Sequence, residues 1–237
     1  MTNLNYKMNK DISLSKAAII AGIGLLIMTL TVPFAEFKII PDLVNPNNAL
    51  ETASNITNNS LLFNVAIFLI FITIVSDIVV AWALYIFLKP VNKSLSVLTA
   101  WFRLLYTGVY LVAITNLIKV FTLTKGASYF HSNSQEQISE FMLFYIKSYK
   151  YEWFFGLVLF GLYLILLGFL VLKAGYIPKI MGWLLIIAGI GYVVGHLKVF
   201  LYPDLNTSFS MFTALGELVF MLWLLIKGSR TKELQIG

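Results

Sequence analysis

Three charged side chains lie inside long apolar stretches of the sequence, where a charge is costly. They are Asp77, Arg103 and Glu217. An ionised side chain at the centre of a membrane-spanning helix costs about 2.5–3.5 kcal/mol on insertion scales, so such residues face the bundle interior and find partners. At about 1.5 Å per residue from the ends of their stretches, all three lie at similar depth. We therefore expect a buried cluster with Arg103 between two carboxylates, because its planar guanidinium can serve two acceptors.

Polar side chains at helical spacing extend this expected cluster. Thr73 precedes Asp77 by four residues, and Thr107 and Tyr110 follow Arg103 by four and seven. Residues at these spacings share one face of a helix. We therefore expect their hydroxyl groups to hydrogen-bond the buried charges.

The expected cluster has two interpretations, and the sequence leaves both open. Two carboxylates against one guanidinium leave one negative charge unbalanced, which suits a proton relay or a pocket for a cationic or hydrogen-bonding ligand. The structural interpretation is that the cluster only locks the helices together. A lipid-modifying enzyme that uses Glu217 or Asp77 as a general acid or base ranks behind both. We assign no catalytic residue, and an enzyme is the less favoured class of protein.

The remaining residue types exclude several chemistries. The chain has no cysteine and two histidines, whereas a catalytic zinc site needs about three nitrogen, oxygen or sulfur ligands. We expect no metal site and no cofactor. Glu36, after the first apolar stretch, and His196, near the outer end of the fifth, are secondary candidates for the site. A lone histidine at a membrane edge is more often an interfacial hydrogen-bonding residue.

Composition sets the class of protein to which these residues belong. Hydrophobic residues make up 59% of the 237 residues and charged residues 12%, against roughly 45–50% and 25% in soluble domains. Too few polar side chains exist to cover a soluble globule. The net charge of +6 does not indicate nucleic-acid binding, because the basic residues lie at the ends of apolar stretches, where they orient a membrane protein. The chain is expected to be an integral membrane protein.

Six stretches are long and apolar enough to cross a bilayer, which takes about 20 residues. They predict one all-α domain over residues 1–237, a bundle of six transmembrane helices at 17–34, 61–88, 95–118, 153–172, 180–201 and 209–226. With both termini in the cytoplasm, the inner side carries ten basic residues and two acids, and the outer side six basic residues and seven acids. This asymmetry favours N-in/C-in orientation.

The two longer outer connections differ in pattern. Residues 38–60 are rich in Asn, Pro and Thr and are interpreted as an irregular loop. Residues 135–150 carry apolar side chains at helical spacing, which predicts an amphipathic helix on the outer surface between the third and fourth spans. An extension of the fourth span above the bilayer explains that pattern equally well.

Small residues at helical spacing indicate where helices approach closely. The first span carries four of them and the fifth span carries others, namely Ala17, Ala18, Ala21, Gly22, Gly182, Gly189, Gly191 and Gly195. Such positions allow backbones to pack in a membrane. We interpret them as packing sites rather than ligand sites.

Several motifs resemble a known family over nearly the whole chain. The matching segments are KPVN at 89–92, WFRLLY at 101–106, GLVLFGL at 156–162, GYIPKI at 175–180, AGIGY at 188–192, GEL at 216–218 and WL at 223–224. They are similar to the prokaryotic membrane proteins grouped as domain of unknown function 4386 (DUF4386). Asp77 and Glu36 fit this resemblance, while Tyr163 and His196 depart from the His and acidic residues of relatives. The resemblance implies a multi-spanning helical protein in the cytoplasmic (inner) membrane of a prokaryote and no particular activity.

The sequence thus predicts a membrane protein that binds or transports a small molecule or lipid through a buried polar centre. The alternative is a structural or partner-binding membrane subunit. Expected partners are membrane lipids, a hydrophobic or small-molecule ligand, and another copy or a membrane subunit. Nucleic acid is not among them.

Overall fold

The computed structural model describes residues 12–126, 134–207 and 215–230, and within these ranges it is helical without strands. The elements are α1 (Leu14–Val32), η1 (Pro33–Ile39), α2 (Ile40–Leu43), α3 (Ala49–Asn58), α4 (Ser60–Leu88), α5 (Lys93–Thr124), α6 (Gln135–Lys173), α7 (Lys179–Leu201), α9 (Leu215–Ile226) and η3 (Gly228–Arg230). Side-chain caps fix several starts. Asn92 accepts a hydrogen bond from the Leu95 backbone, and Ser134 and Gln137 form a capping box, which satisfies free N–H groups at the helix ends.

Five helices are long and apolar enough to cross a membrane: Leu14–Leu43, α4, α5, α6 and α7. All five correspond to expected spans and run beyond the expected bounds, three of them by six or more residues at one end. The expected sixth span, 209–226, is represented by the 12 residues of α9, about 18 Å long at 1.5 Å per residue. Residues 209–214 lie outside the described ranges, so the count of six stays a prediction.

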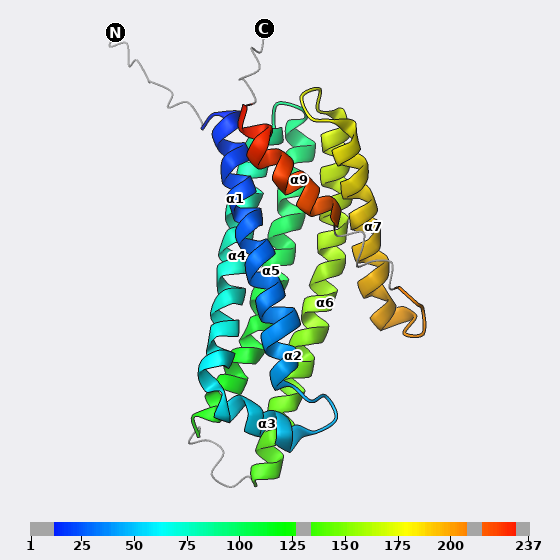
Figure 1. The fold of residues 1–237 in the computed structure, drawn as a ribbon. Coiled ribbons are helices and arrows are strands. Elements are labelled where there is room, and N and C mark those ends of the chain that lie inside the picture. Colours follow the sequence, from blue (N-terminus) through cyan, green and yellow to red (C-terminus); the bar gives the residue numbers. More distant parts are fainter. Residues whose placement is uncertain (1–11, 127–133, 208–214, 231–237) are drawn as a thin grey trace, which may run out of the picture.

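The long helices alternate in direction and lie side by side (Figure 1). The turns after α4 and α6 lie at one end, where the Tyr176 hydroxyl donates to the Phe87 carbonyl oxygen over 2.6 Å. The start of α1 and the C-terminal η3 meet at that end too, where the Ser15 hydroxyl hydrogen-bonds the Ser229 carbonyl. The short Lys-containing connections therefore share one end of the bundle. Its orientation in a membrane stays a prediction.

The prediction of an irregular loop at residues 38–60 is wrong. A π-helical segment, η1, carries α1 directly into α2, and α3 fills most of the remainder. Asn48 caps α3 by accepting a hydrogen bond from the Glu51 backbone, and Ala53 and Ile56 are buried. Asn48 and Asn59 stand at the ends of α3, where they do not interrupt the helix. The buried Thr52 donates its hydroxyl to the Asn45 carbonyl oxygen.

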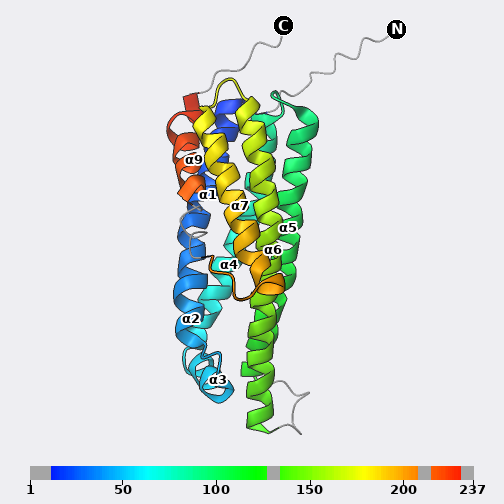
Figure 2. The same ribbon diagram turned by 90° about the vertical axis from the view of Figure 1, so that its right-hand side faces the viewer.

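The separate amphipathic helix expected at residues 135–150 is also absent. These residues form the first turns of one continuous helix, α6, which runs the full length of the bundle (Figure 2). Their apolar stripe is packed inside the protein, with Met142, Ile146 and Tyr149 buried. No Pro or Gly interrupts the chain before Trp153, so the helix continues. The extension of the fourth span is the correct alternative.

Glycines bring α6 and α7 into direct backbone contact. An added Cβ at Gly161 would lie 2.7 Å from the Gly189 carbonyl oxygen, and one at Gly168 would lie 2.6 Å from that of Gly182. The two glycines on each helix are seven residues apart, so both contacts fall on one face. The packing expected of Gly182 and Gly189 is confirmed. On α1, the expected small face is buried, and Gly22 packs against Leu225 of α9.

Candidate functional site

Asp77 of α4 and Arg103 of α5 form the ion pair that the sequence predicts. Arg103 Nη2 lies 2.6 Å from Asp77 Oδ1, and the two side chains are 1% and 0% exposed. The pair connects adjacent antiparallel helices at one level of the bundle. A buried pair of this kind favours one register of the two helices over its alternatives.

Tyr163 of α6 is the third member of this centre, and the sequence did not single it out as a partner. Arg103 Nη1 donates to the Tyr163 hydroxyl over 2.7 Å. The guanidinium carbon also lies 4.9 Å from the centre of the Tyr163 ring and 5.5 Å from that of Phe160. Arg103 therefore ties together α4, α5 and α6. The available signal was that Tyr163 is a polar side chain within the apolar fourth span.

Glu217 does not complete the cluster, which corrects the expected arrangement of Arg103 between two carboxylates. It is partly buried on α9 and hydrogen-bonds the Tyr192 side chain of α7. Its effect on Arg103 is electrostatic, without an ion pair between these two described residues. The reason is topological, because α9 packs mainly on α1 and α7. Similar depth in the membrane did not bring the two side chains together.

The expected polar neighbours of the pair also bond elsewhere. Thr73 Oγ1 lies 2.7 Å from Thr31 Oγ1, and Thr107 donates to the Arg103 carbonyl oxygen over 2.8 Å. Neither reaches a charged group. Asp77 Oδ2 and Arg103 Nε consequently remain buried without hydrogen-bond partners. The centre is therefore held by the direct pair and by Tyr163.

Tyr110 belongs to a second buried centre, formed around Glu36 of η1. The hydroxyls of Tyr110 of α5 and Tyr149 of α6 both donate to Glu36 Oε1, the former over 2.7 Å. Glu36 is 7% exposed. Glu36, a secondary candidate, and Tyr110, expected as a neighbour of Arg103, therefore hydrogen-bond each other. Tyr149 was not predicted from the sequence as a site residue.

His196 lies on α7 and packs among aromatic side chains. Its Nδ1 lies 2.9 Å from the Tyr192 carbonyl oxygen on the same helix. The ring stacks on Tyr192 and meets Phe154 edge-on. Within the described residues, no group of three His, Asp or Glu side chains could hold a metal ion.

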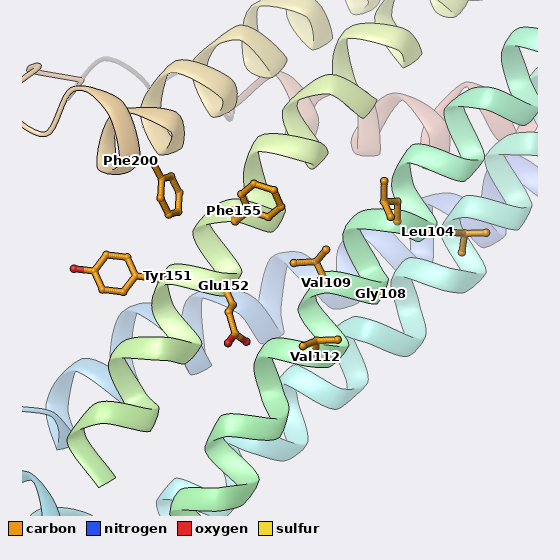
Figure 3. A pocket seen from close by; sticks show the side chains of 9 residues that line it. Leu104, Gly108, Val109, Val112, Tyr151, Glu152, Phe155 and Phe200 are labelled. Carbon is orange, nitrogen blue, oxygen red and sulfur yellow. The ribbon is translucent and has the colours of Figure 1, made fainter. Parts of the chain in front are cut away.

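Two cavities among the described residues are lined by neither Asp77 nor Arg103. The cavity that touches Tyr163 has a volume of about 10 Å³, room for one water molecule at most. A much larger groove, about 520 Å³, lies between α5, α6 and the end of α7 (Figure 3). Its lining is apolar apart from Glu152 and the Tyr151 hydroxyl: Leu104, Leu105, Gly108, Val109, Val112, Tyr151, Glu152, Phe155 and Phe200.

Glu152 forms the polar end of this groove. Its side chain extends from α6 toward α5 (Figure 3), where Asn116 donates to Oε2 over 2.8 Å. The Lys119 ammonium donates to Asn116 Oδ1 over 3.1 Å. The Asn116 amide therefore links the Glu152 carboxylate to the Lys119 ammonium group beside the apolar groove.

Five long apolar helices around a buried ion pair define a multi-pass helical membrane protein. The chain belongs to the family described as "Domain of unknown function (DUF4386)", whose model matches residues 20–228. It is 35% identical over 164 residues to an uncharacterised protein of Archaeoglobus fulgidus, a match that covers 69% of this chain and 84% of the relative. No solved structure matches the chain.

Proposed function

We propose that this protein binds a membrane phospholipid with an amino head group in the groove between α5, α6 and α7. The observation that carries the proposal is the groove of about 520 Å³, whose walls are apolar and whose polar end is Glu152. Ligand sites typically have volumes of about 300–1,000 Å³, with mostly apolar walls and a few placed polar groups. The lining residues Leu104–Val112 cover about 12 Å along α5, enough for a long segment of one acyl chain.

The chemistry at the polar end supports an amino head group rather than an anionic one. Glu152 supplies a carboxylate for an ammonium group, and the exposed Lys119 supplies a cation for the lipid phosphate. Tyr151 and Glu152 precede the apolar stretch 153–172 of α6. Glu152 lies about 30 Å from Lys173 along the helix at 1.5 Å per residue, close to the thickness of the hydrocarbon core of a bilayer, which favours a position near the head groups. A zwitterionic phospholipid matches this order of charges and apolar surface.

The buried Asp77–Arg103 pair has a structural role in this proposal. Direct pairing and a neighbouring cavity of about 10 Å³ leave no room for a ligand of several atoms beside it. Transport through this centre is therefore not part of the proposal. The pair supports the site by holding α5 and α6, two walls of the groove, in register.

Filling the groove tests the proposal. Nothing lies within 4 Å of a Cβ added at Gly108, so Gly108→Phe is expected to place a ring in the groove without disturbing the bundle. The protein is purified in mild detergent from membranes that contain phosphatidylethanolamine and phosphatidylglycerol, and retained lipid is counted by native mass spectrometry. We expect one retained phosphatidylethanolamine per wild-type chain. Gly108→Phe should weaken retention at least tenfold, which corresponds to about 1.4 kcal/mol.

Two further variants separate the acyl chain from the head group. Val79→Phe adds the same ring to the exposed face of α4 and should retain lipid as the wild type does. Glu152→Gln keeps a side-chain oxygen for Asn116 but removes the charge, so it should lose the preference for phosphatidylethanolamine over phosphatidylglycerol. Equal retention by wild type and Gly108→Phe would refute the groove as the binding site.

A further inference from the structure

Glu36 is a buried acid without a buried base. Asp77 has Arg103 at 2.6 Å, whereas the only polar contacts of Glu36 among the described residues are the two tyrosine hydroxyls. An ionised carboxylate in an apolar interior is strongly unfavourable unless it is paired with a cation. Asp77 is therefore a buried acid paired with a cation, whereas Glu36 is a buried acid bonded only to neutral hydroxyl groups within the described ranges.

Among the residues that the structure describes, no cation pairs with Glu36. On its own segment, Lys38 is exposed and pairs with Asp42. The neighbouring half of α4, residues 60–74, has no ionisable side chain. On the other elements, Glu51 of α3 is exposed, and the next ionisable group on α5 is the phenol of Tyr106, stacked on Tyr110. On α6, Lys147 and Lys150 are exposed, and Lys150 lies over the Phe154 ring. The described residues therefore form no ion pair with Glu36.

The hydrogen bonds at Glu36 fit a neutral carboxyl group. Both phenols donate to Oε1, and Oε2 has no hydrogen-bond partner within the described residues. A protonated carboxyl has one carbonyl oxygen that accepts and one oxygen that carries the hydrogen. The geometry assigns the carbonyl role to Oε1 and leaves Oε2 for the proton.

The backbone presents Glu36 to the core through an uncommon geometry. Residues Pro33–Ile39 form a π-helical segment between two α-helices. Such segments are rare and occur frequently at functional sites. Here the wider turn directs Ala35, Glu36 and Ile39 inward, and Glu36 meets side chains that are 74 and 113 residues away in the sequence.

We propose that Glu36, Tyr110 and Tyr149 form a proton-binding site in the interior of the bundle. The proton is held on Glu36 Oε2, and the two phenols fix the carboxyl group through Oε1. Binding and release involve no covalent step besides O–H bond formation and cleavage, with water as the other proton carrier. The site is separate from the lipid groove, and neither proposal depends on the other.

Infrared difference spectroscopy of the wild-type protein in lipid vesicles tests this site. A protonated carboxyl has a C=O stretching band that a carboxylate lacks. We expect such a band at neutral pH, its loss in Glu36→Gln, and its loss from the wild type at alkaline pH. Tyr110→Phe and Tyr149→Phe should each retain the band and move it to higher frequency, because the carbonyl loses one hydrogen bond.

Matched controls make the result decisive. Glu140→Gln removes an exposed carboxylate from the same helix as Tyr149 and should leave the band unchanged. Added sodium ions should also leave it unchanged, whereas its loss on adding sodium would assign the site to a metal cation and overturn the proposal. A wild type without the band at neutral pH, or tyrosine variants without a frequency shift, would overturn it as well.

Discussion

Replacing Arg103 by Gln should cost the protein about 3–5 kcal/mol of folding free energy, the range for breaking a buried ion pair by removing one partner. Asp77 is 0% exposed and would lose its counter-ion, so it must either hold an unpaired charge or take up a proton, and both cost folding free energy. Tyr163 would lose a donor to its hydroxyl at the same time. The unfolding free energy, measured by titrating the protein with sodium dodecyl sulfate in mixed micelles, checks this loss.

A double variant separates the pair from general disturbance of the core. Asp77→Asn with Arg103→Gln removes both charges, so it should be less destabilised than the sum of the single variants. Arg230→Gln, at an exposed position, serves as the control and should change stability by no more than about 0.5 kcal/mol. Wild-type stability in the single Arg103 variant would show that the pair does not hold the bundle together.

Alanine at Gly161 and alanine at Gly108 should change stability in opposite directions. At Gly161 the added methyl group would lie 2.7 Å from the Gly189 carbonyl oxygen, so α7 must move away from α6. Overpacking of this kind costs about 1–3 kcal/mol. At Gly108 nothing lies within 4 Å, and alanine in a helix interior is favoured over glycine by about 0.5–1 kcal/mol.

Thermal unfolding of the two alanine variants in the same detergent measures this difference. Gly189→Ala, on the opposite helix, should repeat the loss seen at Gly161, because its Cβ would lie 2.6 Å from the Gly161 carbonyl oxygen. Equal melting temperatures for the Gly108 and Gly161 variants would contradict close backbone contact between α6 and α7.

The class of protein and the positions of five long helices could be predicted from the sequence, because apolar length alone determines them. The secondary structure of the segments between these helices was harder to predict. Residues 38–60 have a loop-like composition, yet part of that segment is a helix, because Asn48 caps its N-terminus and Ile56 is buried against the bundle. At Gln135–Lys150 the apolar stripe was recognised, but a stripe on a membrane surface and one buried in a long helix have the same spacing.

The candidate site was predictable only in part, because depth along a helix does not specify which helices are neighbours. Asp77 and Arg103 lie on the two helices of one hairpin, so these side chains at similar depth are in contact. Glu217 lies at a similar depth on a helix packed mainly against α1 and α7, and it bonds Tyr192 instead. Glu36 and Tyr149 are 113 residues apart, and no spacing rule in one sequence connects them.

The contact between the two ends of the described chain has a consequence for biosynthesis. The small-residue face of α1, with Ala17, Ala18 and Gly22, is covered by α9 and η3. A ribosome makes α1 before α4–α7 and makes its cover, α9 and η3, after them. Until α9 has been synthesised, the small-residue face of α1 must be shielded by lipid or by the insertion machinery, and this side of the bundle closes only afterwards.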